Sequence, residues 1–446
     1  MRIALVSDCY EPRVGGIERH VAALARHLAR AGHRVFVVTA TAESHGAPSL
    51  PATSGSPAPS SSRDGANPPS DSVSDPAADQ VSDLHSHVVQ IRRLGRGFAG
   101  LPVTPSGYRL LSAELAEIRP DVVHIHAGLV SPFANQAIQI ALAAHIPLVI
   151  TWHSVLAGVM TRVLPALGPL GRTQTMPLWY PRQLRSGQGA VLTAVSARAA
   201  FAAQRCFGTP IPVKVLINAV DPGDWDIERP VIRAGGALRV VSAMRLAPRK
   251  RVADIVRLSH TLTPRDATCG VDWVVCGTGP FRHLASAVTR TRVVRFVGLK
   301  NRDALKQLYR QADVFVAPSP DESFGLAALE ARLAGLPIIV RTGAPVADLF
   351  DNIPQTELDS ASKNALDSVA LSELGAGLQN AVISVDSHAK LGQILAHFAQ
   401  NPSGPQLAAF RDAARTLPPI PGWKDSVAEH MRLYAQAIAL VTASGA

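Results

Sequence analysis

Residues 314–341 read VFVAPSPDESFGLAALEARLAGLPIIVR, and this stretch decides the fold class. An apolar run at 314–317 ends in Pro318, which is typical of a buried strand that enters a loop. Helix formers dominate 323–333, and Gly335 with Pro337 stops the helix before a second apolar run at 338–340. The pattern is typical of parallel strands joined by a helical crossover. The stretch therefore predicts a strand–helix–strand unit of an α/β fold.

Two carboxylates mark this unit, Glu322 just before the helix and Glu330 within it. If both were helical they would lie about 12 Å apart along the axis, which suits the two ends of a sugar nucleotide better than one metal ion. The amides of Phe324, Gly325 and Leu326 would be unpaired first-turn donors and hence a phosphate site. The alternative is an acidic first turn that only complements the helix dipole. Glu330 is harder to explain in that way, because it lies in an apolar run where a carboxylate needs a partner.

Both halves of the chain open with the same pattern. A strand at 2–7 leads through Gly15 and Gly16 into a helix at 17–31 and a strand at 34–40, and a second unit starts with a strand at 238–243. We predict two Rossmann-like, doubly wound domains at 1–222 and 223–423, and a helix at 424–446 that crosses back onto the first domain. The glycine pair lets backbone amides approach a ligand oxygen closely, although such a pair is more often only a turn.

Three segments interrupt this pattern. Residues 41–87 are rich in Ser, Pro, Ala, Gly and Asp, which predicts a disordered insertion that serves as a spacer. Residues 155–185 mix apolar side chains with arginines and prolines, and they are interpreted either as helices packed over the sheet or as an acceptor-binding segment. Residues 351–376 are predicted to form an inserted loop or a small helix.

Cations gather in the loop that follows the strand at 238–243, where Arg245, Arg249, Lys250 and Arg251 lie close together in the chain. Positive charge at the start of the next helix opposes the helix dipole. An anion bound between these side chains is the simplest explanation, because charge-assisted hydrogen bonds would offset the repulsion. A solvated basic turn is the alternative.

Three histidines lie where strands of the first half end. His124 and His126 point to the same face of a strand at 121–126, and His153 follows a strand at 148–151. Ligands of doubly wound sheets bind at the carboxyl ends of the strands, which favours a functional role there over simple packing. A zinc site is the weaker interpretation, because no pair has helical spacing and no carboxylates accompany the histidines.

The composition indicates a multidomain protein of a reducing compartment. The chain has 446 residues, of which 47% are hydrophobic, so two or three buried cores are expected. The cysteines Cys9, Cys206, Cys269 and Cys276 form no CxxC pair and are predicted to be reduced core residues. Residues 1–7 lack the pattern of a signal peptide, and polar residues interrupt the apolar stretch at 133–151. We therefore expect a cytoplasmic protein.

The net charge is +10, and the excess of Lys and Arg lies in the first half of the chain. A basic face there could contact an anionic membrane peripherally, or bind a phosphorylated acceptor or a nucleic acid. No nucleic-acid-binding motif accompanies the charge, so no nucleic acid partner is predicted. The alternative explanation is a GC-rich genome that uses arginine in place of lysine.

The string SPDESFGLAALEARLAGLP resembles the signature of glycosyltransferase family 4, in which two glutamates flank seven residues. The motifs of that family follow one another in the same order along nearly the whole chain, except in 41–90 and roughly 352–376. The resemblance implies a GT-B architecture, in which two Rossmann-like domains face each other across a cleft. It also implies a nucleotide-diphosphate sugar donor, retention of anomeric configuration, and an activity like that of bacterial enzymes of the phosphatidylinositol mannosyltransferase type.

The resemblance also assigns roles to individual residues. Gly15 and Gly16 match the glycines near the donor phosphates and sugar, and His126 matches a histidine that contacts the donor sugar. Arg245 and Lys250 match the pair that grips the diphosphate, whereas Glu322 matches the glutamate at the sugar and Glu330 the one at the ribose. Phe324, Gly325 and Leu326 match the backbone around the phosphates. By this match His126, Glu322, Arg245 and Lys250 are the candidate catalytic residues.

The sequence departs from the family pattern at two places. The family commonly has glycine before the diphosphate arginine and after the lysine, whereas Met244 and Arg251 stand here. This departure puts the backbone path of the basic loop in doubt, though not its charges. The usual Gly-Gly-Glu after the last central strand is replaced by TGAPV at 342–346, so sugar contacts there are expected to differ.

The expected activity is transfer of a hexose, with mannose from a GDP donor as one candidate, to a lipid-linked or small phosphorylated acceptor. Charge that develops on the leaving diphosphate would be stabilised by Arg245, Lys250 and the amides near Phe324. No Asp-x-Asp lies near a strand end, so neither a metal ion nor a cofactor is expected. The alternatives are a nucleotide-sugar epimerase and a non-catalytic sugar-nucleotide-binding protein. A nicotinamide dehydrogenase is disfavoured because no glycine fingerprint is complete.

Overall fold

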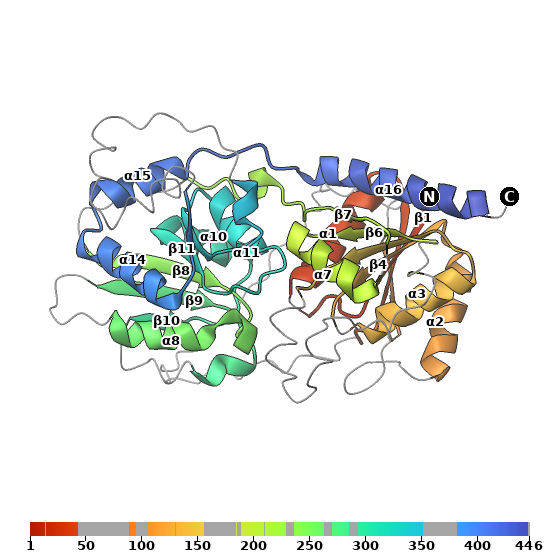
Figure 1. Ribbon diagram of the computed structural model, residues 1–446, viewed down its shortest axis with the longest axis horizontal. Coiled ribbons are helices and arrows are strands. Elements are labelled where there is room, and N and C mark those ends of the chain that lie inside the picture. Colours follow the sequence, from red (N-terminus) through yellow and green to blue (C-terminus); the bar gives the residue numbers. More distant parts are fainter. Residues whose placement is uncertain are drawn as a thin grey trace, which may run out of the picture.

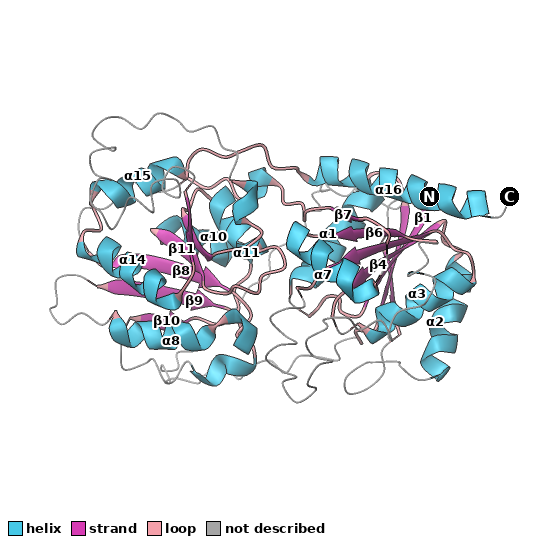
Figure 2. Cartoon of the chain, viewed as in Figure 1, coloured by secondary structure: helices cyan, strands magenta, loops and turns pink. Residues whose placement is uncertain are grey.

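The computed structural model describes residues 1–13, 15–42, 89–94, 105–129, 131–155, 184, 189–208, 210–228, 236–262, 270–284, 293–350 and 381–444. Within these ranges the chain forms two parallel sheets, each covered by helices on both faces (Figures 1 and 2). This is the predicted α/β fold with two Rossmann-like, doubly wound domains. The segments at 43–88, 156–183 and 351–380, which contain most of the predicted insertion, the possible acceptor segment and the polar loop, lie outside the described residues.

The N-terminal domain has a seven-stranded sheet in the order β3-β2-β1-β4-β5-β6-β7 among the described residues. Its strands are β1 (Arg2–Ser7), β2 (Arg34–Thr39), β3 (Gln90–Arg93), β4 (Val122–Ala127), β5 (Leu148–Trp152), β6 (Val191–Ala194) and β7 (Val213–Val215). Its helices are α1 (Gly16–Arg30), α2 (Pro105–Ile118), α3 (Pro132–Ala143) and α7 (Ala197–Phe207). The inner strands β1, β2, β4, β5 and β6 are mostly apolar and buried because both faces of the sheet are covered, whereas the edge strands β3 and β7 are partly exposed.

The C-terminal domain has a six-stranded sheet in the order β10-β9-β8-β11-β12-β13 among the described residues. Its strands are β8 (Leu238–Ala243), β9 (Val271–Cys276), β10 (Val294–Phe296), β11 (Val314–Ala317), β12 (Ile338–Arg341) and β13 (Val382–Val385). Its helices are α8 (Val252–Thr261), α10 (Arg302–Gln311), α11 (Leu326–Leu333), α14 (His388–Gln400) and α15 (Pro405–Ala413).

A final helix, α16 (Trp423–Ser444), follows the C-terminal domain but lies over the N-terminal one (Figure 1). Its buried residues Trp423, Leu433, Tyr434 and Ala437 join the apolar cluster formed by β1, β2 and α1. The helix therefore ties the two domains together at the side of the N-terminal sheet. None of the described helices is long and apolar enough to cross a bilayer.

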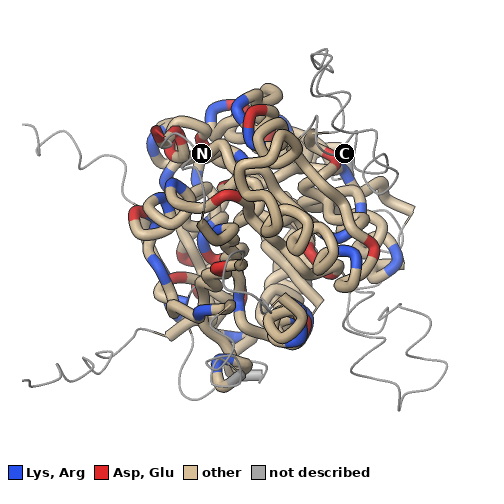
Figure 3. The backbone as a smooth tube through the Cα atoms, turned by 90° about the vertical axis from the view of Figure 1, so that its left-hand side faces the viewer, with Lys and Arg blue, Asp and Glu red and all other residues tan. Residues whose placement is uncertain are grey.

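The order of the strands reverses beside β1 and beside β8, since the chain moves outward on one side and then resumes on the other. At such a switch point the loops after the central strands separate and leave a crevice at the carboxyl ends. The loops after β1 and β4 and those after β8 and β11 thus provide the positions for ligand-binding residues. Positions of Lys and Arg are interspersed with those of Asp and Glu along the chain in the end-on view of Figure 3.

Helix α11 differs from its prediction in a way that affects the site. The helix was expected to begin at Ser323, but it begins at Leu326 because Gly325 adopts a left-handed conformation with φ of 100°. Glu322 therefore lies in the loop before the helix, and the helical spacing of about 12 Å between the two glutamates does not apply.

Candidate active site

A cleft of about 890 Å³ separates the two domains and is lined by both. The N-terminal wall comes from the loop after β1, the first turn of α1 and the residues after β5. The C-terminal wall comes from the loops after β8, β9 and β11. The predicted site residues that line the cleft are Gly15, Gly16, Arg245, Lys250, Glu322, Phe324, Gly325, Leu326 and Glu330.

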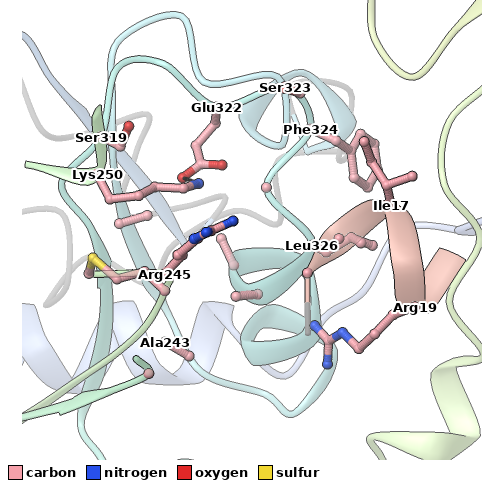
Figure 4. Close-up of a pocket in the computed structure, with 18 of the residues that line it drawn as sticks. Ile17, Arg19, Ala243, Arg245, Lys250, Ser319, Glu322, Ser323, Phe324 and Leu326 are labelled. Atoms are coloured by element: carbon pink, nitrogen blue, oxygen red, sulfur yellow. Dashed lines mark hydrogen bonds and ion pairs between the residues drawn. The ribbon is translucent and has the colours of Figure 1, made fainter. Parts of the chain in front are cut away.

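The basic loop after β8 and the acidic loop after β11 meet at the C-terminal wall. The Lys250 ammonium forms an ion pair with the Glu322 carboxylate, and Arg245 points into the same cavity (Figure 4). Ser319 fastens the two loops together, because its hydroxyl donates to the carbonyl of Arg249 at 2.8 Å. The two sequence segments are about seventy residues apart, and the parallel pairing of β8 with β11 brings them together.

The backbone of the basic loop keeps a tight turn without the glycines that the family commonly has. Arg251 adopts a left-handed conformation with φ of 59° and ψ of 34°, which glycine would adopt at less cost. Its side chain donates to the Asp254 carboxylate at 2.6 Å, and this ion pair offsets part of the strain. The departure at Arg251 thus leaves Lys250 directed into the cleft.

The loop after β9 supports the loop that carries Arg245. The amide of Leu246 donates to the carbonyl of Thr278 at 3.0 Å, and the amide of Met244 donates to the carbonyl of Cys276 at 3.0 Å. Gly277, with φ of 136°, lies against this loop so closely that a Cβ atom there would be 1.8 Å from the Met244 carbonyl oxygen. Glycine is needed at this position because any side chain would displace the Arg245 loop.

The start of α11 presents unpaired amides to the cleft. Gly325 accepts from the amides of Ala328 and Leu329, so the helix begins there. Within the described part of the chain, no hydrogen bond engages the amides of Phe324, Gly325 and Leu326. Together with the helix dipole these donors form a site suited to phosphate.

Glu330 lies deeper in the cleft and is bonded across the domains. It is buried with 7% exposure, and the Arg19 guanidinium of α1 lies 3.2 Å from its carboxylate. Burial raises the pKa of Glu330, and the neighbouring Arg19 opposes that rise. The carboxylate in an apolar run is thus explained by a cation from the other domain.

The glycine pair allows the two domains to approach closely. A Cβ atom on Gly16 would lie 3.7 Å from the side chain of Leu326, at the start of α11. Gly15 is extended, and the Glu18 carboxylate folds back against it. The start of α1 therefore faces the start of α11 across the cleft.

The structure places His153, rather than His126, on the wall of the cleft. His126 is 1% exposed and lies behind His153, with its Nδ1 atom 3.0 Å from Nε2 of His153. His126 lies away from the cleft because β5 adjoins β4 and the chain after β5 covers the end of β4. The prediction of a direct sugar contact by His126 does not fit this placement.

Several residues of the site were missed. Ser196 donates to the carbonyl of Ser323 at 2.7 Å, and Arg198 donates to the carbonyl of Pro320 at 2.6 Å, so that α7 of the N-terminal domain holds the loop of Glu322. Arg19 and Ser319 were missed as well. No local pattern marks these residues, because each partner is distant in sequence.

The described ranges contain no group of three or more His, Cys, Asp or Glu side chains arranged to hold a metal ion. The polar groups of the cleft are mainly cations and amides, which are suited to anionic oxygen atoms. This arrangement can bind a diphosphate between the two domains.

Comparison with known proteins agrees with this geometry. The family described as Glycosyltransferase Family 4 matches residues 14–224, and the family described as Glycosyl transferases group 1 matches residues 225–353. A glycogen synthase of Mycobacterium tuberculosis is 31% identical over 358 residues, which cover 76% of this chain and 77% of that protein. The chain belongs to glycosyltransferase family 4.

Solved structures show the same fold for this family 4 glycosyltransferase. A sucrose-phosphate synthase from Thermosynechococcus elongatus superposes with a TM-score of 0.61 at 16% identity, covering 98% of this chain and 99% of that one. A D-inositol 3-phosphate glycosyltransferase of Actinosynnema mirum is 32% identical over 151 residues, which cover 31% of this chain and 36% of that protein. The predicted GT-B architecture and the prediction of a glycosyltransferase are confirmed.

Proposed function

We propose that this glycosyltransferase retains the anomeric configuration and transfers a hexose from a nucleotide-diphosphate sugar to a hydroxyl acceptor. One observation carries the proposal: Arg245, Lys250 and the unpaired amides at the start of α11 line one wall of the interdomain cleft. Positive groups and amides held there before the reaction would stabilise the negative charge of a leaving diphosphate.

The proposed reaction is a front-face exchange at the anomeric carbon. The bond from that carbon to the diphosphate oxygen breaks, the acceptor oxygen bonds on the same face, and the acceptor proton passes to the departing phosphate. Each of the two signature glutamates is paired with a cation, Glu322 with Lys250 and Glu330 with Arg19. These pairings favour binding roles for both glutamates over a covalent nucleophile.

The reaction is proposed to need neither a metal ion nor a cofactor, since Arg245 and Lys250 would supply the positive charge that a divalent ion often supplies. A direct test is activity after dialysis against a chelator. Unchanged turnover supports the proposal, and loss of turnover that added Mg²⁺ or Mn²⁺ restores would overturn it.

The donor is proposed to be a hexose linked to GDP, UDP or ADP. The resemblance suggested mannose, whereas the relative that covers three quarters of the chain is named for glycogen synthesis. We therefore place a glucosyl donor first and a GDP-mannose donor second.

The acceptor is proposed to be a small phosphorylated or lipid-linked molecule. Arg13 and Arg19 line the N-terminal wall of the cleft, where an anionic acceptor would gain from their charge. Relatives named D-inositol 3-phosphate glycosyltransferases share shorter segments with this chain. A basic N-terminal domain would also allow peripheral contact with an anionic membrane. A glucan is the second candidate acceptor, because of the relative named glycogen synthase.

Thermal-shift measurements with GDP-, UDP- and ADP-sugars test the donor first, because a ligand that binds the folded state raises its stability with the logarithm of ligand excess. The stabilising donor is then incubated with inositol phosphate, a phospholipid vesicle or glycogen, and the anomeric configuration of the product is read by NMR. Transfer with retention supports the proposal.

Two other results would favour the alternatives. Release of an epimerised free sugar and nucleotide without any acceptor would indicate an epimerase. Binding without turnover, combined with a Lys250→Ala variant that keeps the biological activity of the gene, would indicate a non-catalytic sugar-nucleotide-binding protein.

A further inference from the structure

Five histidines form a buried cluster beside the cleft, between the N-terminal sheet and helix α16. The members of this histidine cluster are His20, His124, His126, His153 and His430. Neighbouring rings lie close, with centroids 4.3 Å apart for His124 and His126 and 5.2 Å apart for His126 and His153. Only His153 of the cluster lines the cleft. The contacts of the others therefore determine how that one ring can act.

Both ring nitrogens of His124 are hydrogen-bonded. Nε2 lies 2.7 Å from the Thr151 hydroxyl, and Nδ1 lies 2.9 Å from the Tyr434 hydroxyl. The Thr151 hydroxyl in turn contacts the Thr193 hydroxyl at 2.6 Å. Burial lowers the pKa of His124, so this ring is neutral and fully bonded, and it lies tilted against His126.

His126 makes a single hydrogen bond among the described residues, through Nδ1 to Nε2 of His153 at 3.0 Å, and its Nε2 atom is buried without a partner. Two proton arrangements are possible for this bond. If His126 accepts, its own proton is on Nε2, where a buried N–H group is left without an acceptor. If His126 donates from Nδ1, only a bare lone pair is left, which is the less costly arrangement.

Donation by His126 also determines the state of His153. Since Nε2 of His153 accepts, its remaining proton is on Nδ1, which is the nitrogen left for a ligand in the cleft. Burial lowers the pKa of His153 to about 3, so the ring stays neutral near pH 7. His153 can then donate a hydrogen bond but brings no positive charge.

We propose that His126 is a positioning residue, which holds His153 in the Nδ1–H tautomer so that His153 donates to a hydroxyl of the substrate in the cleft. In solution the other tautomer, Nε2–H, is the common one for histidine, so the assignment requires a partner that imposes it. Only the kinetic test of this inference rests on the proposed function. The tautomer itself is a property of the free protein.

The first test needs no substrate. Long-range ¹⁵N–¹H NMR of protein labelled at histidine reports which ring nitrogen carries the proton, and the His153 signals are assigned by their loss in His153→Gln. The expected result is an Nδ1–H tautomer for His153 in the wild type. An Nε2–H tautomer in the wild type would overturn the proposal, whether or not any variant folds.

The second test uses two variants of His126. In His126→Asn the side-chain amide can donate from nearly the place of Nδ1–H, whereas His126→Leu has no donor. We expect His126→Leu to lower kcat about 10- to 100-fold, the range seen when partners that orient metal-binding histidines are removed. The KM of the donor should change less, and His126→Asn should restore most of the activity. Equal losses in both variants, in proportion to lowered melting temperatures, would show a structural role only.

A double variant separates positioning from other effects. In a His153→Ala background, His126→Leu should lower kcat no further, because His126 is proposed to act through His153. A further loss as large as in the wild-type background would contradict the proposal. If the NMR result holds while no nucleotide sugar is turned over, the proposed function fails and the positioning of His153 stands.

Discussion

Lys250 and Arg245 are proposed to meet the charge of the leaving diphosphate. Both side chains lie at the cleft, and Lys250 is held by its ion pair with Glu322 (Figure 4). An ammonium held in a cleft before the reaction avoids much of the reorganisation that water would require. The contribution of each cation should therefore appear mainly in the rate of transfer.

Lys250→Ala is predicted to lower kcat/KM about 10²- to 10³-fold, the loss typical of removing one group that stabilises developing charge. Steady-state kinetics with the donor found by thermal shift would measure it. Arg257→Ala is the matched control, because it removes one exposed cation of the same domain outside the cleft. Equal activity of Lys250→Ala and the control would contradict the role of Lys250.

Gly277→Ala is predicted to abolish donor binding by displacing the Arg245 loop. The new Cβ atom would lie 1.8 Å from the Met244 carbonyl oxygen, so the backbone must move. The rise in melting temperature that the donor produces should disappear. The free energy of unfolding should also fall by several kcal/mol, which is at the upper end of the range for single substitutions. Gly223→Ala is the control, because a Cβ atom there meets no atom within 4 Å. A normal donor shift in Gly277→Ala would disprove the need for glycine.

The sequence was informative about residues whose signal is local. Arg245 and Lys250 precede a helix whose dipole they oppose, and Glu330 interrupts an apolar run, so each could be singled out. His153 could be singled out by its position after a strand, but Arg19 and Ser319 could not, because their partners are in the other domain or in another loop. His126 was assigned to the cleft because the sequence cannot show that the chain after β5 covers the end of β4.

At the scale of the elements, α11 illustrates what can be predicted. Its existence and its end before Gly335 follow from helix formers and stop signals, but its start depends on the left-handed conformation of Gly325. Helix boundaries of this kind depend on backbone dihedral angles that a residue pattern specifies only loosely. The same helix also has a structural role that the pattern did not indicate.

Arg332 of α11 connects that helix to the segment after α15. Its buried guanidinium donates to the carbonyls of Ala413 at 3.2 Å and Thr416 at 2.7 Å and also to that of Ala414. Arg332→Met should leave these acceptors without partners and lower the free energy of unfolding by about 2–4 kcal/mol. Urea denaturation measures the change, with the exposed Arg310→Met of α10 as control. A loss below about 0.5 kcal/mol would contradict the role of Arg332.

The histidine cluster between the N-terminal sheet and α16 predicts how the free energy of unfolding depends on pH. Burial lowers the pKa of all five rings, to about 3 for His153 and about 4 for His430. Below about pH 6.5 the unfolded chain binds protons at these rings and the folded chain does not, so stability falls as the pH falls. Each neutral ring contributes a slope of up to about 1.4 kcal/mol per pH unit.

Asp8 acts in the opposite direction, because burial raises its pKa to about 6. It should offset about one histidine between pH 6 and 4. Urea unfolding at pH 7, 6 and 5 should therefore show a clear net loss of stability, and His430→Phe should reduce the slope. A free energy of unfolding that stays constant from pH 7 to pH 5 would be inconsistent with neutral buried rings.

At the scale of the whole molecule, side chains of the N-terminal domain bond to the C-terminal one at the cleft. Ser196 and Arg198 hold the carbonyls of Ser323 and Pro320, and Arg19 pairs with Glu330. The position of Glu322 in the donor site thus depends on how the two domains approach each other. The sequence predicts the two domains and the cleft between them, but not these bonds.

Arg198→Ala is predicted to lower kcat/KM about tenfold, because the loss of a hydrogen bond to a charged group costs about 1.5–3 kcal/mol and part is recovered by water. Its melting temperature should change little, since Arg198 lies at the edge of the cleft. Arg205→Ala, on the same helix but stacked over Phe201, is the control. If both variants transferred sugar at the wild-type rate, α7 would have no part in holding the loop of Glu322.

The most direct measurement is a crystal structure of the protein with the nucleoside diphosphate of its donor. We expect the two phosphates to lie between Arg245 and Lys250 and to accept hydrogen bonds from the amides of Phe324, Gly325 and Leu326. A diphosphate bound elsewhere, with Arg245 and Lys250 both turned away from it, would contradict the proposed donor site.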